Sequence, residues 1–125
     1  MILGIDHIVL TVADLERTLR FYAEVLGMRA LREPDRPAAL LIGSQKINVH
    51  ETARTFEPKA LRPTPGSADF CLVTDRPLQE WVDRLALHGV ALDLGPVERA
   101  GARGKMQSIY FRDPDANLIE VSRYD

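Results

Sequence analysis

Four side chains that could bind a divalent metal occupy repeated places in this chain. His7 and Asp69 each lie in the first apolar, strand-like segment of one half of the sequence, 62 residues apart. His50 and Glu120 lie in the last such segment of each half, 70 residues apart. Imidazole and carboxylate groups suit Zn²⁺, Ni²⁺, Fe²⁺ or Mn²⁺. We therefore predict a metal site that uses all four, provided that the fold brings them together.

The two acidic candidates are the more informative ones, because apolar residues flank both Asp69 and Glu120. Burying an unpaired carboxylate costs several kcal/mol, so each of these groups needs a cation. A metal ion would satisfy them. A salt bridge, for instance with Lys46 or Arg112, is the alternative that the sequence leaves open.

Local sequence patterns predict the elements that position these residues in the first half. Asp14 is a good helix N-cap, and Gly27 is placed to end that helix in the left-handed conformation. The helix has an apolar stripe of Leu15, Leu19, Tyr22 and Leu26. Strands are predicted around it at residues 5–12, 28–33, 38–43 and 46–51.

The second half repeats this order after a connector rich in proline. Asp75 is the candidate N-cap and Gly89 the stop of the second helix. Strands are predicted at 68–74, 90–94, 106–112 and 117–122. We therefore expect an α+β fold: one domain of residues 1–125 built from two pseudo-symmetric β-α-β-β-β modules, which form a cleft between curved sheets. The module boundaries are about 1–52 and 67–125, with a connector at 53–66.

Composition limits the partners that this chain would have. Its 125 residues fit one domain, and 16 Lys+Arg against 18 Asp+Glu give a formal net charge of −2. That balance gives no electrostatic reason to expect nucleic acid or an anionic membrane surface. No apolar run reaches the roughly 20 residues of a membrane span. The single cysteine, Cys71, excludes an intrachain disulfide, so we expect a cytoplasmic protein.

Three segments of the chain resemble the vicinal oxygen chelate superfamily, which includes glyoxalase I, extradiol dioxygenases and bleomycin-binding proteins. They are His7–Leu15, Phe21–Met28 and Tyr110–Glu120. Two further segments, Gln45–Glu51 and Phe56–Ala60, are similar to the glyoxalase domain-containing protein 5 group and its bacterial virulence-associated relatives. The resemblance spans essentially the whole chain.

The resemblance implies a ligand set for the metal. The ligand of the family's first strand falls on His7 and the carboxylate of its last strand on Glu120. The position that is usually histidine holds Asp69, and a position that is glutamate in glyoxalase I falls on His50, or less plausibly on Glu51.

The resemblance also implies an activity: a metal-dependent lyase or isomerase, similar to lactoylglutathione lyase, that acts on a small substrate with vicinal oxygens. Glu120 would be the general base. The alternatives are an iron-dependent extradiol-type dioxygenase and a non-enzymatic protein that binds a small molecule such as an antibiotic. Relatives of this size resemble homodimers, so we expect one here.

Several polar residues near the last strands are candidates for substrate binding. Arg103 and Lys105 lie in a basic loop with glycines, which would either close over an anionic substrate or form a solvated hairpin. Tyr110 and Arg112 alternate toward the expected cavity. Cys71 shares the strand face of Asp69, and we interpret it as a packing residue because a buried thiol stays protonated.

Overall fold

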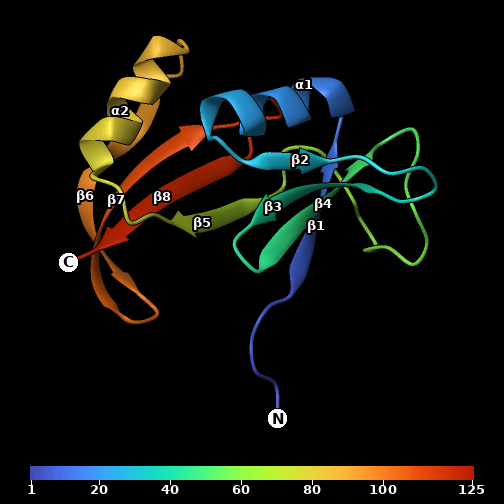
Figure 1. Cartoon of the computed structure of the whole chain (residues 1–125), viewed down its shortest axis with the longest axis horizontal. Coiled ribbons are helices and arrows are strands. Elements are labelled where there is room, and N and C mark those ends of the chain that lie inside the picture. The colour runs from blue at the N-terminus through green and yellow to red at the C-terminus, as the bar shows by residue number, and fades with distance from the viewer. The chain divides into compact units, whose positions relative to one another are not determined.

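Each half of the chain folds into a four-stranded mixed sheet with a helix on one of its faces (Figure 1). The structure is a computed structural model that describes residues 1–125. The chain divides into a first unit, Met1–Ser67, and a second unit, Ala68–Asp125. The α+β class predicted from the sequence is confirmed, and the predicted connector belongs to the first unit.

The first unit contains four strands in the order β1-β4-β3-β2. Strands β1 and β4 are parallel, whereas β2 and β3 are antiparallel to their neighbours. The helix is α-helical at first and continues as a π-helical segment, η1. The elements are β1 (His7–Val12), α1 (Leu15–Arg20), η1 (Phe21–Val25), β2 (Arg29–Leu31), β3 (Ala38–Ile42) and β4 (Gln45–Glu51).

The second unit repeats this topology with the order β5-β8-β7-β6. Its outer strand β5 is parallel to β8, and the remaining pairs are antiparallel. The elements are β5 (Asp69–Val73), α2 (Leu78–Leu87), β6 (Leu92–Gly101), β7 (Gly104–Arg112) and β8 (Leu118–Tyr124). No helix in the structure is long and apolar enough to cross a membrane.

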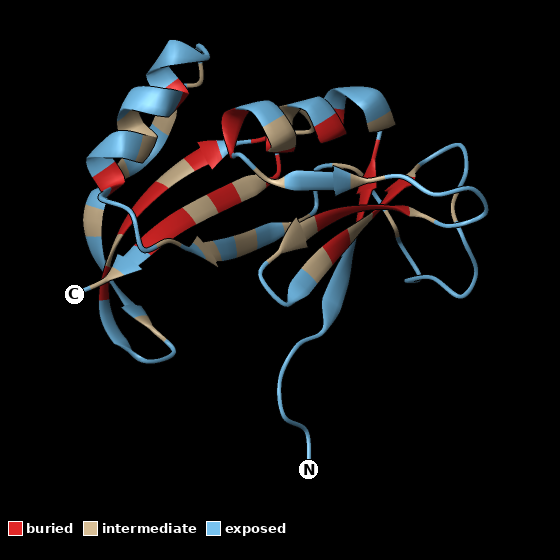
Figure 2. Cartoon of the chain, viewed as in Figure 1, coloured by how far each residue is buried: buried red, intermediate tan, exposed pale blue.

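The core of each unit lies between the helix and one face of the sheet. In the first unit the buried strand residues of that face include Leu10, Val12, Ile47 and Val49. In the second unit they are Ile109, Phe111, Ile119 and Val121. Because side chains alternate along a strand, residues between these positions point to the opposite face of each sheet. Figure 2 shows buried and intermediate residues alternating along part of β8.

Local signals explain where most of the helices begin and end. Asp14 accepts a hydrogen bond from the Arg17 N–H at 3.1 Å and is the N-cap of α1, as predicted. Gly27 and Gly89 both follow their helices with φ at 71°, the left-handed conformation that glycine adopts without strain.

Two predictions about the second unit were wrong. Asp75 does not cap α2, because the helix begins only at Leu78 and Pro77 occupies the N-cap position without a side-chain hydrogen bond. The strand predicted at 90–94 extends to Gly101. It pairs with β7 as far as Gly101 and Gly104, so the predicted basic loop is a tight hairpin.

The strand registers also correct our alignment of the two halves. His7 lies opposite Lys46 in the first unit, and Asp69 lies opposite Leu118 in the second. The same backbone hydrogen bond occurs in both units, from Lys46 N–H to the Asp6 carbonyl at 3.3 Å and from Leu118 N–H to the Ala68 carbonyl at 3.0 Å. In these registers the partner of Glu120 in the duplication is Asn48, and His50 corresponds to Ser122.

Candidate functional site

Glu120 lies in the middle of β8 on the sheet face opposite the helix, and its carboxylate has a fixed orientation. Oε2 accepts hydrogen bonds from Ser108 Oγ at 2.7 Å and from Ser122 Oγ at 3.0 Å. Both serines are fully buried, and their hydroxyls lie 2.6 Å apart. This arrangement holds one carboxylate oxygen against the sheet and leaves Oε1 for another partner.

Asp69 lies on the same sheet face as Glu120, at the beginning of the neighbouring strand β5. Glu120 pairs with Cys71 on β5, and Asp69 lies two residues before Cys71, which is about 7 Å along the strand. Arg112, one of the two cations suggested as a salt-bridge partner, pairs instead with Asp93 at 2.8 Å. The Asp69 side chain is exposed, so its carboxylate oxygens are accessible to a metal ion.

Cys71 is the residue directly opposite Glu120, and its thiol lies 3.1 Å from Ser122 Oγ. Partial burial raises the pKa of the thiol, and the charge of Glu120 raises it further, while the hydrogen bond with Ser122 acts in the other direction. We had interpreted Cys71 as a packing residue, but its side chain is exposed. Its raised pKa nevertheless makes it a poor nucleophile, as we expected.

His7 begins β1 in the first unit, where its side chain is exposed. Its Nδ1 lies 2.8 Å from Asp6 Oδ1. Because an ionised carboxylate only accepts hydrogen bonds, Nδ1 is the donor in this contact, and Nε2 is the ring nitrogen that Asp6 does not engage. A histidine that donates one ring N–H to a carboxylate in this way is typical of metal sites.

The structure separates His50 from His7. His50 lies opposite Thr11, four residues beyond His7 on β1, which is about 13 Å along the strands. Two imidazoles at this separation cannot share an ion that binds each at about 2.1 Å. The His50 ring is buried and lies against Phe56, with centroids 5.1 Å apart and planes tilted by 53°, and its Nδ1 has no hydrogen-bond partner. Burial lowers the pKa of His50, and the charge of Lys59 lowers it further.

Sequence reasoning missed Asn48, which occupies the place in the first unit that Glu120 occupies in the second. It lies opposite Val9 and shares a sheet face with His7, two residues further along. An amide oxygen binds a metal ion more weakly than a carboxylate does, and it brings no negative charge to the site. Only the strand register, and no motif, points to it.

The basic hairpin between β6 and β7 divides its cations between two faces. Arg99 shares the face of Glu120, where its Nε donates to Tyr110 Oη at 2.9 Å. Arg103 lies over the Tyr124 ring at 4.2 Å. Lys105 points to the opposite face and pairs with Glu98 at 3.6 Å. The register thus places Arg99, which we had not predicted, with the acidic candidates.

The two other predicted substrate-binding residues share the face of Glu120. Tyr110 lies directly opposite Glu120, and Arg112 lies opposite Leu118. Phe111 between them is fully buried, as the alternation predicts. Arg112 also donates to the Ala116 carbonyl at 3.2 Å, so that both of its known contacts are structural.

The residues present fit a divalent metal chemically. His7 and Glu120 both have the outer hydrogen bonds that orient metal ligands, from Asp6 and from the two serines. Asp69 adds a second carboxylate. The structure contains no group of three His, Cys, Asp or Glu side chains around one point.

Comparison with known proteins identifies the family. The model of the Glyoxalase/Bleomycin resistance protein/Dioxygenase superfamily matches residues 4–121. The chain is 53% identical over 120 residues to virulence protein STM3117 of Salmonella typhimurium, covering 96% of this chain and 83% of that protein. The crystal structure of that protein matches with a TM-score of 0.96 at 52% identity, covering 100% of this chain and 99% of the other.

A second relative is the glyoxalase domain-containing protein RDO1 of Mycosarcoma maydis, 46% identical over 97% of this chain and 68% of that protein. More distant relatives are named lactoylglutathione lyase, catechol-2,3-dioxygenase and metallothiol transferase, so the family includes several chemistries. The chain belongs to the glyoxalase/bleomycin resistance/dioxygenase superfamily, the vicinal oxygen chelate superfamily.

Proposed function

We propose that this chain is a metal-dependent enzyme of the glyoxalase type, acting on a small substrate with two neighbouring oxygens. His7, Asp69 and Glu120 would hold the divalent ion, and Glu120 would also accept a proton from the substrate. One observation supports this most strongly: two buried serines hold Oε2 of Glu120, while Oε1 takes part in neither hydrogen bond.

The chain's own residues would divide the work as follows. When bound, the metal would polarise the two substrate oxygens and so ease removal of a proton from the adjacent carbon. Oε1 of Glu120, the oxygen left free to hold the ion, would detach from it to take that proton, because Oε2 is engaged by Ser108 and Ser122. The serines would keep the carboxylate in position without an ordering step during the reaction.

Tyr110 and Arg99 would bind the substrate beside Glu120. Both lie on the same face of the sheet, and Arg99 is held over the Tyr110 ring at 5.4 Å. A hemithioacetal formed from glutathione has carboxylates that an arginine can bind through two hydrogen bonds, whereas an uncharged catechol does not. Arg112 is a weaker candidate because its charge is already paired with Asp93, whereas Arg99 forms no ion pair.

His7 and the two acidic residues belong to different units, so one ion would draw its ligands from both. We propose that this happens within one chain or across a homodimer. Mixing a His7→Ala chain with a Glu120→Ala chain separates these possibilities, because only a site shared between two chains would regain activity in the mixture.

Metal analysis followed by assays of the loaded protein tests the proposed function. We expect about one divalent ion per chain, turnover of a hemithioacetal, and loss of turnover in Glu120→Gln. The Gln79→Ala variant, at an exposed position on α2, is the control. Oxygen consumption with a catechol would instead show a dioxygenase. Tight binding of a small molecule that survives metal removal, without turnover, would show a binding protein.

A further inference from the structure

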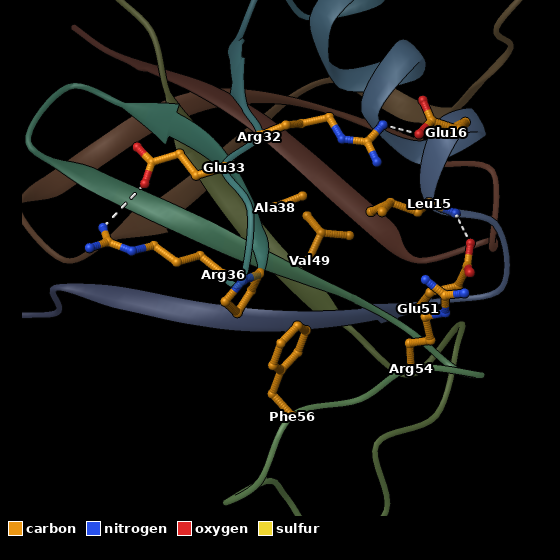
Figure 3. Close-up of a pocket in the computed structure, with 11 residues that line it drawn as sticks. Leu15, Glu16, Arg32, Glu33, Arg36, Ala38, Val49, Glu51, Arg54 and Phe56 are labelled. Atoms are coloured by element: carbon orange, nitrogen blue, oxygen red, sulfur yellow. Dashed lines mark hydrogen bonds and ion pairs between the residues drawn. The ribbon is translucent and has the colours of Figure 1, made fainter.

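A cavity lies within the first unit, on the other side of the sheet from His7 and Asn48. Its volume is about 450 Å³, within the range of about 300–1,000 Å³ typical of small-molecule sites. The start of α1, the turn between β2 and β3, the end of β4 and the following connector enclose it (Figure 3). The lining residues are Leu15, Glu16, Arg32, Glu33, Arg36, Pro37, Ala38, Val49, Glu51, Arg54 and Phe56.

The floor and one wall of this cavity are apolar. Ala38 and Val49 are buried beneath it, and the ring of Phe56 stands beside it, partly exposed (Figure 3). The ring also contacts the buried His50, with ring centroids 5.1 Å apart and the ring planes tilted by 53°. These apolar surfaces suit the aliphatic or aromatic side chain of a single amino acid.

The charged residues around the cavity balance, but two of them are not paired with each other. Three arginines and three glutamates line it. Arg32 pairs with Glu16, and Arg36 pairs with Glu33 at 3.3 Å. Arg54 and Glu51 are the remaining two, and no ion pair joins them.

One tight turn places Glu51 and Arg54 at the same end of the cavity. The Arg54 N–H donates to the Glu51 carbonyl at 2.8 Å, and the two side chains lie next to each other in Figure 3. The Glu51 side chain accepts a hydrogen bond from the Leu15 N–H on Oε2 at 2.8 Å. Its Oε1 therefore remains available, as does the whole guanidinium of Arg54.

We propose that this cavity binds a zwitterionic amino acid with an apolar side chain, at a site separate from the metal. The carboxylate of the ligand would bind the Arg54 guanidinium through two hydrogen bonds, and its ammonium group would bind Glu51. Its side chain would lie on Val49 and Phe56. A bare anion fits less well, because the lining has no excess positive charge.

Titration of the full-length protein with three related probes tests this proposal through amide chemical shifts in NMR. L-phenylalanine has both charges, phenylpropionate lacks the ammonium group and phenylethylamine lacks the carboxylate. We expect L-phenylalanine to bind most tightly and to shift the amides of Leu15, Ala38 and Val49. Arg54→Gln should weaken L-phenylalanine and phenylpropionate about tenfold and leave phenylethylamine unchanged. Glu51→Gln should weaken L-phenylalanine and phenylethylamine instead.

Two controls make the outcome decisive. Arg62→Gln removes an exposed arginine of the same connector outside the cavity and should leave all three affinities unchanged. His7→Ala should also leave them unchanged, which separates this site from the proposed metal site. The proposal is overturned if no probe gives saturable shifts, if phenylpropionate binds as tightly as L-phenylalanine, or if Arg62→Gln acts like Arg54→Gln.

Discussion

The two units share a backbone plan, but their matched positions hold different chemistry. Both contain a parallel outer strand with the same register, and both helices are followed by a glycine with φ at 71°. Yet His7 matches Asp69, and Asn48 matches Glu120. The duplication therefore repeats the backbone positions on this face of each sheet, while the residues at those positions put carboxylates in the second unit only.

The sheet face around these positions differs as well. Beside Glu120 lies Tyr110, whereas Ala39 lies beside Asn48. The outer strand β6 has ten residues, while its counterpart β2 has three, so the second unit alone has an extended basic hairpin. The sheet face around Glu120 therefore has a tyrosine and a hairpin arginine that the face around Asn48 lacks.

Removing the two matched side chains in turn should give the largest effect. Glu120→Ala should abolish metal binding, since it removes a charged ligand, whereas Asn48→Ala should retain most of it. Metal content after dialysis and the melting temperature with and without metal measure this. Equal losses in the two variants would mean that the units contribute equally. An unchanged metal content in His7→Ala/Glu120→Ala would exclude both residues from the site.

The helices should also respond unequally to the same kind of truncation. Val25 is 6% exposed, while Leu87, at the matched position 62 residues later, is 83% exposed. Val25→Ala should lower the free energy of unfolding by about 1.5–3 kcal/mol. Leu87→Ala should change it by less than about 0.5 kcal/mol. Urea denaturation of both variants provides the measurement, and similar losses would show that a further contact buries Leu87.

The hairpin found only in the second unit gives a smaller, kinetic test. Arg99→Ala should raise KM for an anionic substrate about tenfold, because a charge-assisted contact is lost beside Glu120. Lys105→Ala is the matched control: its exposed pair with Glu98 on the other face is worth little. Both variants should retain their metal. A larger effect from Lys105→Ala than from Arg99→Ala would contradict the assignment of the two faces.

The smallest expected effect concerns how the free energy of unfolding depends on pH. His50 in the first unit should contribute to this dependence, whereas its counterpart Ser122 has no group that titrates in this range. The pKa of His50 is lowered from 6.5 by burial, so below that pH the unfolded chain takes up a proton that the folded chain resists. The free energy of unfolding should therefore fall as the pH drops from 6.5 toward the lowered pKa. His50→Gln should flatten this dependence, while His88→Gln, at an exposed histidine, should not. Stability curves that are identical for all three proteins would refute this role.

Most of the fold could be predicted from local signals. The cap at Asp14, the helix stops at Gly27 and Gly89, and the alternation around Phe111 all depend on a few adjacent residues. The start of α2 was mispredicted because Pro77 displaced it from a plausible cap at Asp75. The length of β6 was underestimated because pairing with β7, a nonlocal interaction, extends it through residues that look like a loop.

The candidate site was only partly predictable, for a geometric reason. Aligning His50 with Glu120 instead of Asn48 is an error of two residues, and a shift of two leaves every side chain on the same face of a strand. The alternating pattern therefore cannot reveal such an error. The error becomes visible only when the register of β1 with β4 is known. The sheet face of Arg99 likewise follows only from its pairing with β7 across the hairpin.

At Gly89, just after α2, a side chain is disfavoured by the handedness of the backbone and not by lack of space. A side chain on Gly89 would meet no atom within 4 Å, so the cost of L-alanine there, about 1–2 kcal/mol, comes from the backbone alone. D-alanine prefers the mirror-image conformation, in which φ is positive. A chemically synthesised chain with D-alanine at this position would lose fewer unfolded conformations on folding. It should be more stable than the natural chain by about 0.4–1 kcal/mol.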